Sequence, residues 1–169
     1  MKPKIVVVAS MLALVVMTNA AVAQQPPAAP PTTPYGDPIT LEAAKEVMAA
    51  AEAEAMKNDW PVAIGIVDST GHLVMLHKLD NTQFASIAIA EGKARTALEY
   101  RRPTKALEDA VAGGGVGLRL LAIPGAWPLE GGVPILADGK IIGAIGVSGV
   151  TSSQDAQVAT AGAEAAAAR

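Results

Sequence analysis

Residues 132–147 read GVPILADGKIIGAIGV and contain two apolar runs joined by Asp138-Gly139. A two-residue Asp-Gly connection is typical of a tight hairpin turn, so the two runs predict a pair of antiparallel strands. Pro134 lacks an N–H donor, which favours the start or the edge of the first strand. In the second run Gly143 and Gly146 leave room for a neighbouring element to pack closely. One β-hairpin of the predicted sheet therefore lies here.

A second hairpin is predicted upstream of the first. Residues 62–67, VAIGIV, contain no charged side chain and indicate a central strand that is covered on both faces. Residues 68–71 form a tight turn, and residues 72–79 return as the partner strand. Residues 118–123 predict one more short strand. This half of the chain therefore adds about three strands to the sheet.

Helical periodicity predicts four helices around these strands, over residues 40–57, 84–100 and 104–111 and from Ser152 onward. Thr40 is a suitable N-cap for the first helix, and Ser152 with Asp155 resembles a capping box for the last. Because strands joined by tight turns run antiparallel, the expected fold class is α+β. It comprises a mainly antiparallel sheet of about five strands with flanking helices.

The N-terminal residues predict export. Lys2 and Lys4 precede the apolar run 5–17, and residues 21–23, AVA, supply the small residues of a cleavage site. The apolar run is short for a membrane-spanning helix, and an uncleaved anchor is the alternative. We therefore expect a signal peptide over residues 1–23, cleavage near Ala23, and a periplasmic or secreted protein. Residues 24–38, QQPPAAPPTTPYGDP, predict a Pro-rich disordered linker, which leaves residues 39–169 as the domain.

Composition restricts the chemistry that the chain can carry out. The sequence contains no cysteine, which excludes disulfides, thiol nucleophiles and cysteine-based metal centres. A net charge of -3 argues against nucleic acid as a partner. No Gly-x-Ser-x-Gly elbow is present, and the sequence assigns no histidine to Ser148. Nothing in the spacing of Asp80 and Glu130 requires them to act as paired carboxylates, so ligand binding is favoured over side-chain catalysis, and no catalytic residue is assigned.

Several separated motifs resemble the GlcG/HbpS-like haem-binding family, which also includes the C-terminal domain of PduO-type corrinoid adenosyltransferases. They are VDSTGHLV (67–74), KLDNTQ (78–83), KARTA (93–97), RPT (102–104), PLEGGVPI (128–135), DGKIIGAIGVSG (138–149) and QD (154–155). The resemblance covers about residues 40–166. It implies a five-stranded sheet with flanking helices, homo-oligomers and, in some members, haem or iron binding. The adenosyltransferase activity belongs to a different domain.

Two departures from the family pattern affect the site. The common Arg-Met-Asp-Gly-Ala is KLDNT here, residues 78–82, which adds side chains where Gly-Ala leaves space. The histidine that some haem-binding members carry in the first helix has no counterpart in residues 40–58. Haem ligation therefore does not transfer residue by residue.

His77 is the candidate ligand for a haem iron, with Met75 or Tyr100 as alternatives. His72 and His77 are the two histidines of the chain. They lie an odd number of residues apart, so on one strand they face opposite sides of the sheet and cannot form a two-histidine metal site. The alternative interpretation of His77 is a half-exposed strand residue that binds nothing.

The other candidate ligand-binding residues lie where strands and helices meet. Asp80, Asn81 and Gln83 precede the second helix, whose N-terminus would favour an anion, although a purely structural turn explains them equally well. Further along the chain, two more groups are candidates: Arg102 with Thr104, and Glu130 with Gly131 and Gly132. Lys93, Arg95, Arg101, Arg102 and Lys105 alternate with acidic residues, which is typical of a salt-bridged helix face.

The sequence thus predicts an exported protein that binds a small ligand, either haem, a related tetrapyrrole or iron, and that acts as a homo-oligomer. We expect the Asp80 turn and residues 130–133 to converge on a common pocket or rim. Two alternatives remain open: an oligomeric sensor or interaction module that reaches a membrane partner through its Pro-rich arm, and an enzyme acting on a small carboxylate or a corrinoid.

Overall fold

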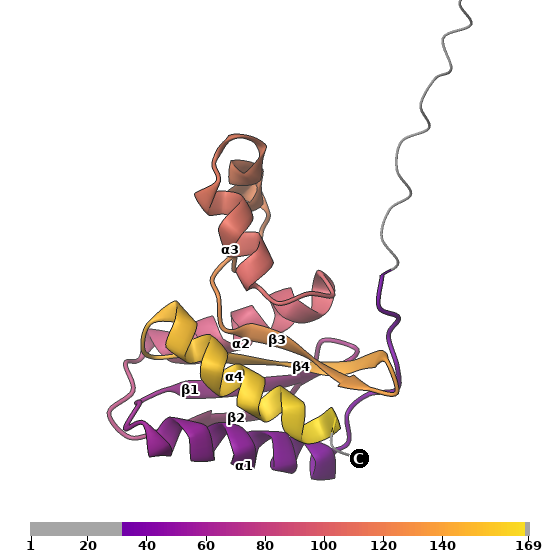
Figure 1. Ribbon diagram of the computed structural model, residues 1–169, viewed down its shortest axis with the longest axis vertical. Helices are drawn as coiled ribbons and strands as arrows, with labels where there is room; N and C mark the ends of the chain where they lie inside the picture. Colours follow the sequence, from indigo (N-terminus) through magenta and orange to yellow (C-terminus); the bar gives the residue numbers. More distant parts are fainter. Residues whose placement is uncertain (1–31, 168–169) are drawn as a thin grey trace, which may run out of the picture. The chain divides into compact units, whose positions relative to one another are not determined.

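The computed structural model describes residues 32–167 (Figure 1). The elements follow one another as α1 (Leu41–Lys57), β1 (Ala63–Asp68), β2 (Leu73–Lys78), α2 (Ala85–Glu99), α3 (Lys105–Ala112), the 3-10 helix η1 (Gly115–Ala122), β3 (Gly132–Ala137), β4 (Lys140–Ser148) and α4 (Ser152–Ala167). The predicted signal peptide and residues 24–31 of the predicted linker lie outside the described residues. Across the described residues no helix combines the length and hydrophobicity needed to span a bilayer.

Four antiparallel strands form the sheet in the order β2-β1-β4-β3. Both predicted hairpins are confirmed, and the pairing of β1 with β4 joins them into one sheet. The predicted strand at residues 118–123 is wrong, because residues 115–122 form η1. An apolar run without alternation does not distinguish strand from helix, and here local i→i+3 bonds satisfy the backbone. The α+β class is confirmed, with four strands instead of five.

Helices cover both faces of the sheet (Figure 1). α1 and α4 pack against each other on one face, where Val47, Met48 and Val158 bury against Ile64 and Ile145. α2 lies on the other face with a smaller cluster of side chains: Val67, Ala94, Ala97, Leu98, Ile141 and Ala144. Each strand of the middle pair is therefore buried on both sides, as the lack of charged residues in VAIGIV indicated.

A row of glycines lets α2 approach the sheet closely. Gly65, Gly146 and Gly132 are register partners on β1, β4 and β3. A Cβ on Gly146 would lie 2.1 Å from the carbonyl oxygen of Ala90, and one on Gly132 would lie 2.3 Å from that of Lys93. The backbone of α2 thus rests directly on this row, which requires the absence of side chains there.

Part of the predicted linker belongs to the folded domain. Tyr35 forms a parallel bridge with Ile141, and the N–H of Gly36 donates to the carbonyl oxygen of Ile141 at 2.9 Å. The Tyr35 hydroxyl donates to the carbonyl oxygen of Leu98 at 2.9 Å, and the guanidinium of Arg101 lies 4.3 Å from the Tyr35 ring centroid. Residues 34–36 of the predicted linker therefore pair with β4, which extends past Asp68 of β1 and offers free backbone groups there.

The helix starts show one confirmed and one misplaced cap. The Thr40 side chain accepts from the N–H of Ala43 at 3.2 Å, as predicted. At the start of α4 the capping pair is Thr151 with Gln154, because the N–H and hydroxyl of Thr151 both donate to Gln154 Oε1. The box predicted at Ser152 and Asp155 is wrong by one residue. This shift leaves the Asp155 carboxylate available for a different partner.

Candidate functional site

The predicted ligand-binding residues lie at one end of the sheet but do not form one pocket. β2 and β4 end there, while β1 and β3 begin there. Asp80 and Asn81 follow β2, whereas Gly131 and Gly132 lead into β3 on the opposite edge, and β1 and β4 separate the two groups. The expected common pocket is therefore absent among the described residues, and each group forms its own environment.

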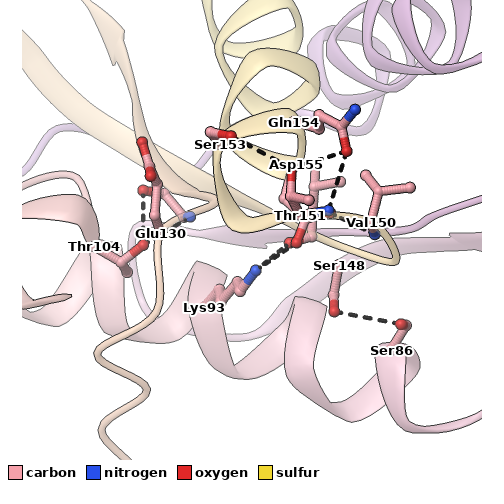
Figure 2. Close-up of polar contacts among 12 residues, drawn as sticks. Ser86, Lys93, Thr104, Glu130, Ser148, Val150, Thr151, Ser153, Gln154 and Asp155 are labelled. Carbon is pink, nitrogen blue, oxygen red and sulfur yellow. Dashed lines mark hydrogen bonds and ion pairs between the residues drawn. The ribbon is translucent and has the colours of Figure 1, made fainter. Parts of the chain in front are cut away.

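The Gly131 group closes around a buried ion pair. We call it the polar corner, formed by Lys93, Thr104, Gly131, Gly132 and Asp155. Lys93 Nζ donates to Asp155 Oδ2 at 2.8 Å and to the carbonyl oxygen of Val147 at 2.9 Å (Figure 2). The two charged side chains are only 2% and 3% exposed. Gly131 adopts a φ of 120°, and a Cβ on it would lie 2.8 Å from Lys93 Nζ. Only glycine fits this position.

Hydrogen bonds within the chain satisfy the polar corner. The N–H of Gly132 donates to Thr104 Oγ1 at 2.9 Å, and that of Glu130 donates to Glu108 Oε2 at 2.6 Å. No buried side-chain nitrogen or oxygen in the described chain lacks a partner. The Arg102 side chain is exposed and donates to the carbonyl oxygen of Tyr100. The structure thus brings Thr104, Gly131 and Gly132 together in a closely packed, internally hydrogen-bonded cluster. The side chain of Arg102 lies outside this cluster.

Burial shifts the pKa of one member of the polar corner. It raises the pKa of Asp155, and the hydrogen bond and positive charge of Lys93 act in the opposite direction. Lys93 is ion-paired, as the predicted salt-bridged helix face implies, but its partner is Asp155 of α4 and both side chains are buried. The stripe of α2 that buries Ala90, Ala94 and Ala97 also contains position 93, so the sequence did carry a signal for a buried lysine.

Asp80 and Asn81 line an open hollow of about 500 Å³ beside the end of β2. We call it the β2 hollow; its lining residues are Met56, Asp59, Trp60, Pro61, Leu79, Asp80 and Asn81. Asn81 has a φ of 62°. It occupies the position of the glycine in the family pattern, and asparagine tolerates this left-handed conformation better than most residues. Gln83 is exposed and lies outside the lining.

His77 and Glu52 form an ion-pair contact between β2 and α1. His77 Nδ1 lies 2.7 Å from Glu52 Oε1, and the side chains are 44% and 25% exposed. His77 precedes the lining residue Leu79 by two residues. Glu52 precedes the lining residue Met56 by four residues on α1, which places the two on one helix face. The pair therefore lies near the β2 hollow, although neither His77 nor Glu52 belongs to its lining.

The carboxylate of Glu52 determines which nitrogen of His77 remains available. An ionised carboxylate only accepts hydrogen bonds, so a hydrogen bond to ionised Glu52 requires the proton of His77 to be on Nδ1. No residue in the described part of the chain bonds to Nε2 of His77. This arrangement, with one ring nitrogen bound to a carboxylate and the other open, is the usual state of a histidine that ligates a metal.

The alternative ligands are less suitable. Met75 packs against the core between the sheet and α1, and Tyr100 caps the C-terminus of α2. His72 lies in the turn before β2 instead of on the strand, with Nδ1 2.8 Å from Thr70 Oγ1. No group of three or more acidic or histidine side chains that could hold a metal ion occurs within residues 32–167. A single imidazole near a hollow of mixed apolar and polar lining suits haem iron better than a free metal ion, which needs several ligands.

A larger hollow of about 690 Å³ lies elsewhere, between residues 37–40, the β3–β4 turn and the end of α4. Its charged lining residues are Asp37 and Asp138, and its lining, like that of the β2 hollow, contains no histidine. Asp80 and Asn81, two of the predicted ligand-binding residues, line the β2 hollow, whereas no predicted ligand-binding residue lines the larger one.

Sequence and structure comparisons both relate this chain to HbpS-like proteins. Residues 39–164 match the family described as haem degrading protein HbpS-like. Protein GlcG of Escherichia coli strain K12 is 43% identical over 110 residues, which span 65% of this chain and 81% of GlcG. The crystal structure of HbpS matches with a TM-score of 0.70 at 35% identity, covering 76% of this chain and 90% of that chain. The crystal structure of a PduOC:heme complex matches with a TM-score of 0.69 at 27% identity, over 76% and 94% of the two chains.

Proposed function

Because the chain belongs to the HbpS-like family, we propose that it binds haem at the β2 hollow, with His77 as the ligand to the iron. The observation that carries this proposal is the open Nε2 of His77, whose other nitrogen is bound to Glu52. The related PduOC has been crystallised with haem, which supports haem over other tetrapyrroles. Catalysis is not part of the proposal.

The residues around the β2 hollow suit a flat apolar ligand. Met56, Trp60, Pro61 and Leu79 supply apolar surface beside the polar side chains of Asp59, Asp80 and Asn81, and the hollow falls within the volume range of small-molecule sites. When bound, haem would supply an iron centre whose potential depends on its axial ligand and surroundings. In this chain His77 would hold the iron, and the apolar residues would exclude water from the ring.

Replacing His77 by alanine is expected to weaken haem binding by more than about tenfold, since even loss of a partner behind a metal ligand commonly has that effect. The measurement is a titration of the purified protein with hemin, followed by the shift and sharpening of the Soret band. His72→Ala is the matched control, because His72 is also an exposed imidazole but is bound to Thr70 away from the hollow.

Equal affinities of wild type and the His77→Ala variant would contradict the proposed site, and no saturable shift in the wild type would contradict haem binding itself. The same titration distinguishes binding from turnover. Decay of the Soret band of bound haem in the presence of a reductant, faster than that of free hemin, would indicate degradation.

We further propose that the protein acts outside the cytoplasm as a homo-oligomer. Residues 1–23 have the pattern of a signal peptide. In the segment from α3 to β3, several large apolar side chains are exposed, which is typical of surfaces that associate: Val116, Leu118, Leu121, Ile123 and Leu129. Native mass spectrometry of protein from its own host is expected to give a multiple of the mass of a chain starting at Gln24. A single-chain mass would contradict the proposed homo-oligomer. Retention of residues 1–23 would contradict the proposed export.

A further inference from the structure

We propose that Glu52 is a positioning residue of the haem site, which fixes the tautomer of His77 so that Nε2 faces the iron. The inference rests on the proposed function of the β2 hollow and assigns a residue that the sequence motifs do not indicate. Glu52 does not touch the ligand itself; it acts through His77.

The contact between Glu52 and His77 has the geometry of a hydrogen bond. Glu52 Oε1 lies 2.7 Å from His77 Nδ1 and joins α1 to the edge strand β2 across 25 residues of sequence. Both side chains are partly shielded from solvent, which strengthens a hydrogen bond to a charged group relative to a fully exposed one. Met48, four residues before Glu52, is buried in the core and fixes this face of α1 against the sheet.

No lysine or arginine of the described chain pairs with Glu52. On α1, Lys45 pairs with Glu42 and Lys57 pairs with Glu54. The carboxylate of Glu52 is therefore directed to His77 alone among the described ion pairs. A carboxylate behind a ligating histidine fixes the ring orientation and increases the basicity of the ligand.

The first test uses the protein without haem. Nitrogen-15 NMR at about pH 9, well above the ~6.5 at which histidine ordinarily titrates, reports which ring nitrogen carries the proton. The wild type is expected to show His77 protonated at Nδ1. In Glu52→Gln the side-chain amide can donate as well as accept, so the population is expected to shift toward protonation at Nε2. An unchanged tautomer in the variant would overturn the proposal.

The second test uses hemin-loaded protein and asks whether Glu52 acts through His77. Glu52→Gln is expected to weaken hemin binding about tenfold, and to shift the midpoint reduction potential in the positive direction, because the imidazole becomes a weaker donor. Combined with His77→Ala, the same substitution is expected to have no further effect on hemin affinity. Glu42→Gln removes the same charge from an exposed position of α1 and serves as the control.

The outcomes separate the two proposals. If the wild type binds no hemin, the proposed function fails, and the tautomer measurement still tests the role of Glu52. If hemin binds through His77 but Glu52→Gln matches Glu42→Gln in affinity and potential, the positioning role is overturned while the proposed function stands. The positioning role would also be overturned if Glu52→Gln lowered hemin affinity equally in the wild-type and His77→Ala backgrounds. The effect of Glu52 would then not depend on His77.

Discussion

Replacing Lys93 by alanine is expected to lower the free energy of unfolding by about 3–5 kcal/mol, because it leaves the Asp155 carboxylate buried without its partner. For a domain of this size the loss corresponds to a decrease in Tm on the order of 10 °C. The measurement is denaturant or thermal unfolding. Lys105→Ala is the control: Lys105 pairs with Asp109 on the surface, where the side chains are 47% and 60% exposed, so its loss should cost at most about 1 kcal/mol.

The deficit of the Lys93→Ala variant is expected to depend on pH. Burial raises the pKa of Asp155 above its ordinary 3.8, and removal of Lys93 takes away the two largest opposing effects, its hydrogen bond and its positive charge. A group whose folded pKa is raised contributes its stability in full below the unfolded value, and loses that contribution as pH rises through the folded value. The free energy of unfolding of the variant should therefore approach that of the wild type as the pH is lowered toward 3.8. The difference between the two should increase toward neutral pH. A loss of stability as small as that of Lys105→Ala would contradict the stabilising role of the buried Lys93–Asp155 pair. A loss of stability that does not vary with pH would contradict it as well.

Replacing Gly146 by alanine is expected to destabilise the domain by about 1–3 kcal/mol or more through overpacking. The new Cβ would lie 2.1 Å from the Ala90 carbonyl oxygen and 2.5 Å from the Ala94 nitrogen. Both are backbone atoms of α2, so no side chain can move aside and the whole helix must shift. Unfolding midpoints of the purified variant measure the effect.

Gly113→Ala is the matched control for this substitution. Gly113 has a φ of −68°, which alanine adopts readily, and a Cβ there would meet no atom closer than 3.4 Å. It should leave stability unchanged or raise it slightly. Equal stabilities of the Gly146→Ala variant and the control would mean that α2 does not rest on the glycine row.

Local signals in the sequence were sufficient for most of the fold. The Asp138-Gly139 turn and the turn over residues 68–71 predicted both hairpins, and helical periodicity predicted the four helices. Two errors have local causes: the apolar run 118–123 is ambiguous between strand and 3-10 helix, and the proline-dense linker concealed the bridge of Tyr35 to Ile141. The family resemblance is confirmed.

The candidate site was only partly predictable, because its decisive contacts join residues far apart in the sequence. His77 and Asp80 were identified, but the partnership of His77 with Glu52 depends on how α1 packs beside β2. Lys93 and Asp155 are 62 residues apart in the sequence. The pattern of α2 indicates that position 93 is buried but does not identify the partner of the lysine. The expected meeting of Asp80 with Gly131 failed because two central strands separate them.

The crystal structure of the protein grown with hemin would show where the ring binds. We expect electron density for iron at Nε2 of His77 and for the ring against Met56, Trp60 and Leu79, with Glu52 still bound to Nδ1. Iron ligated by any other residue, with the β2 hollow empty, would contradict the proposed site.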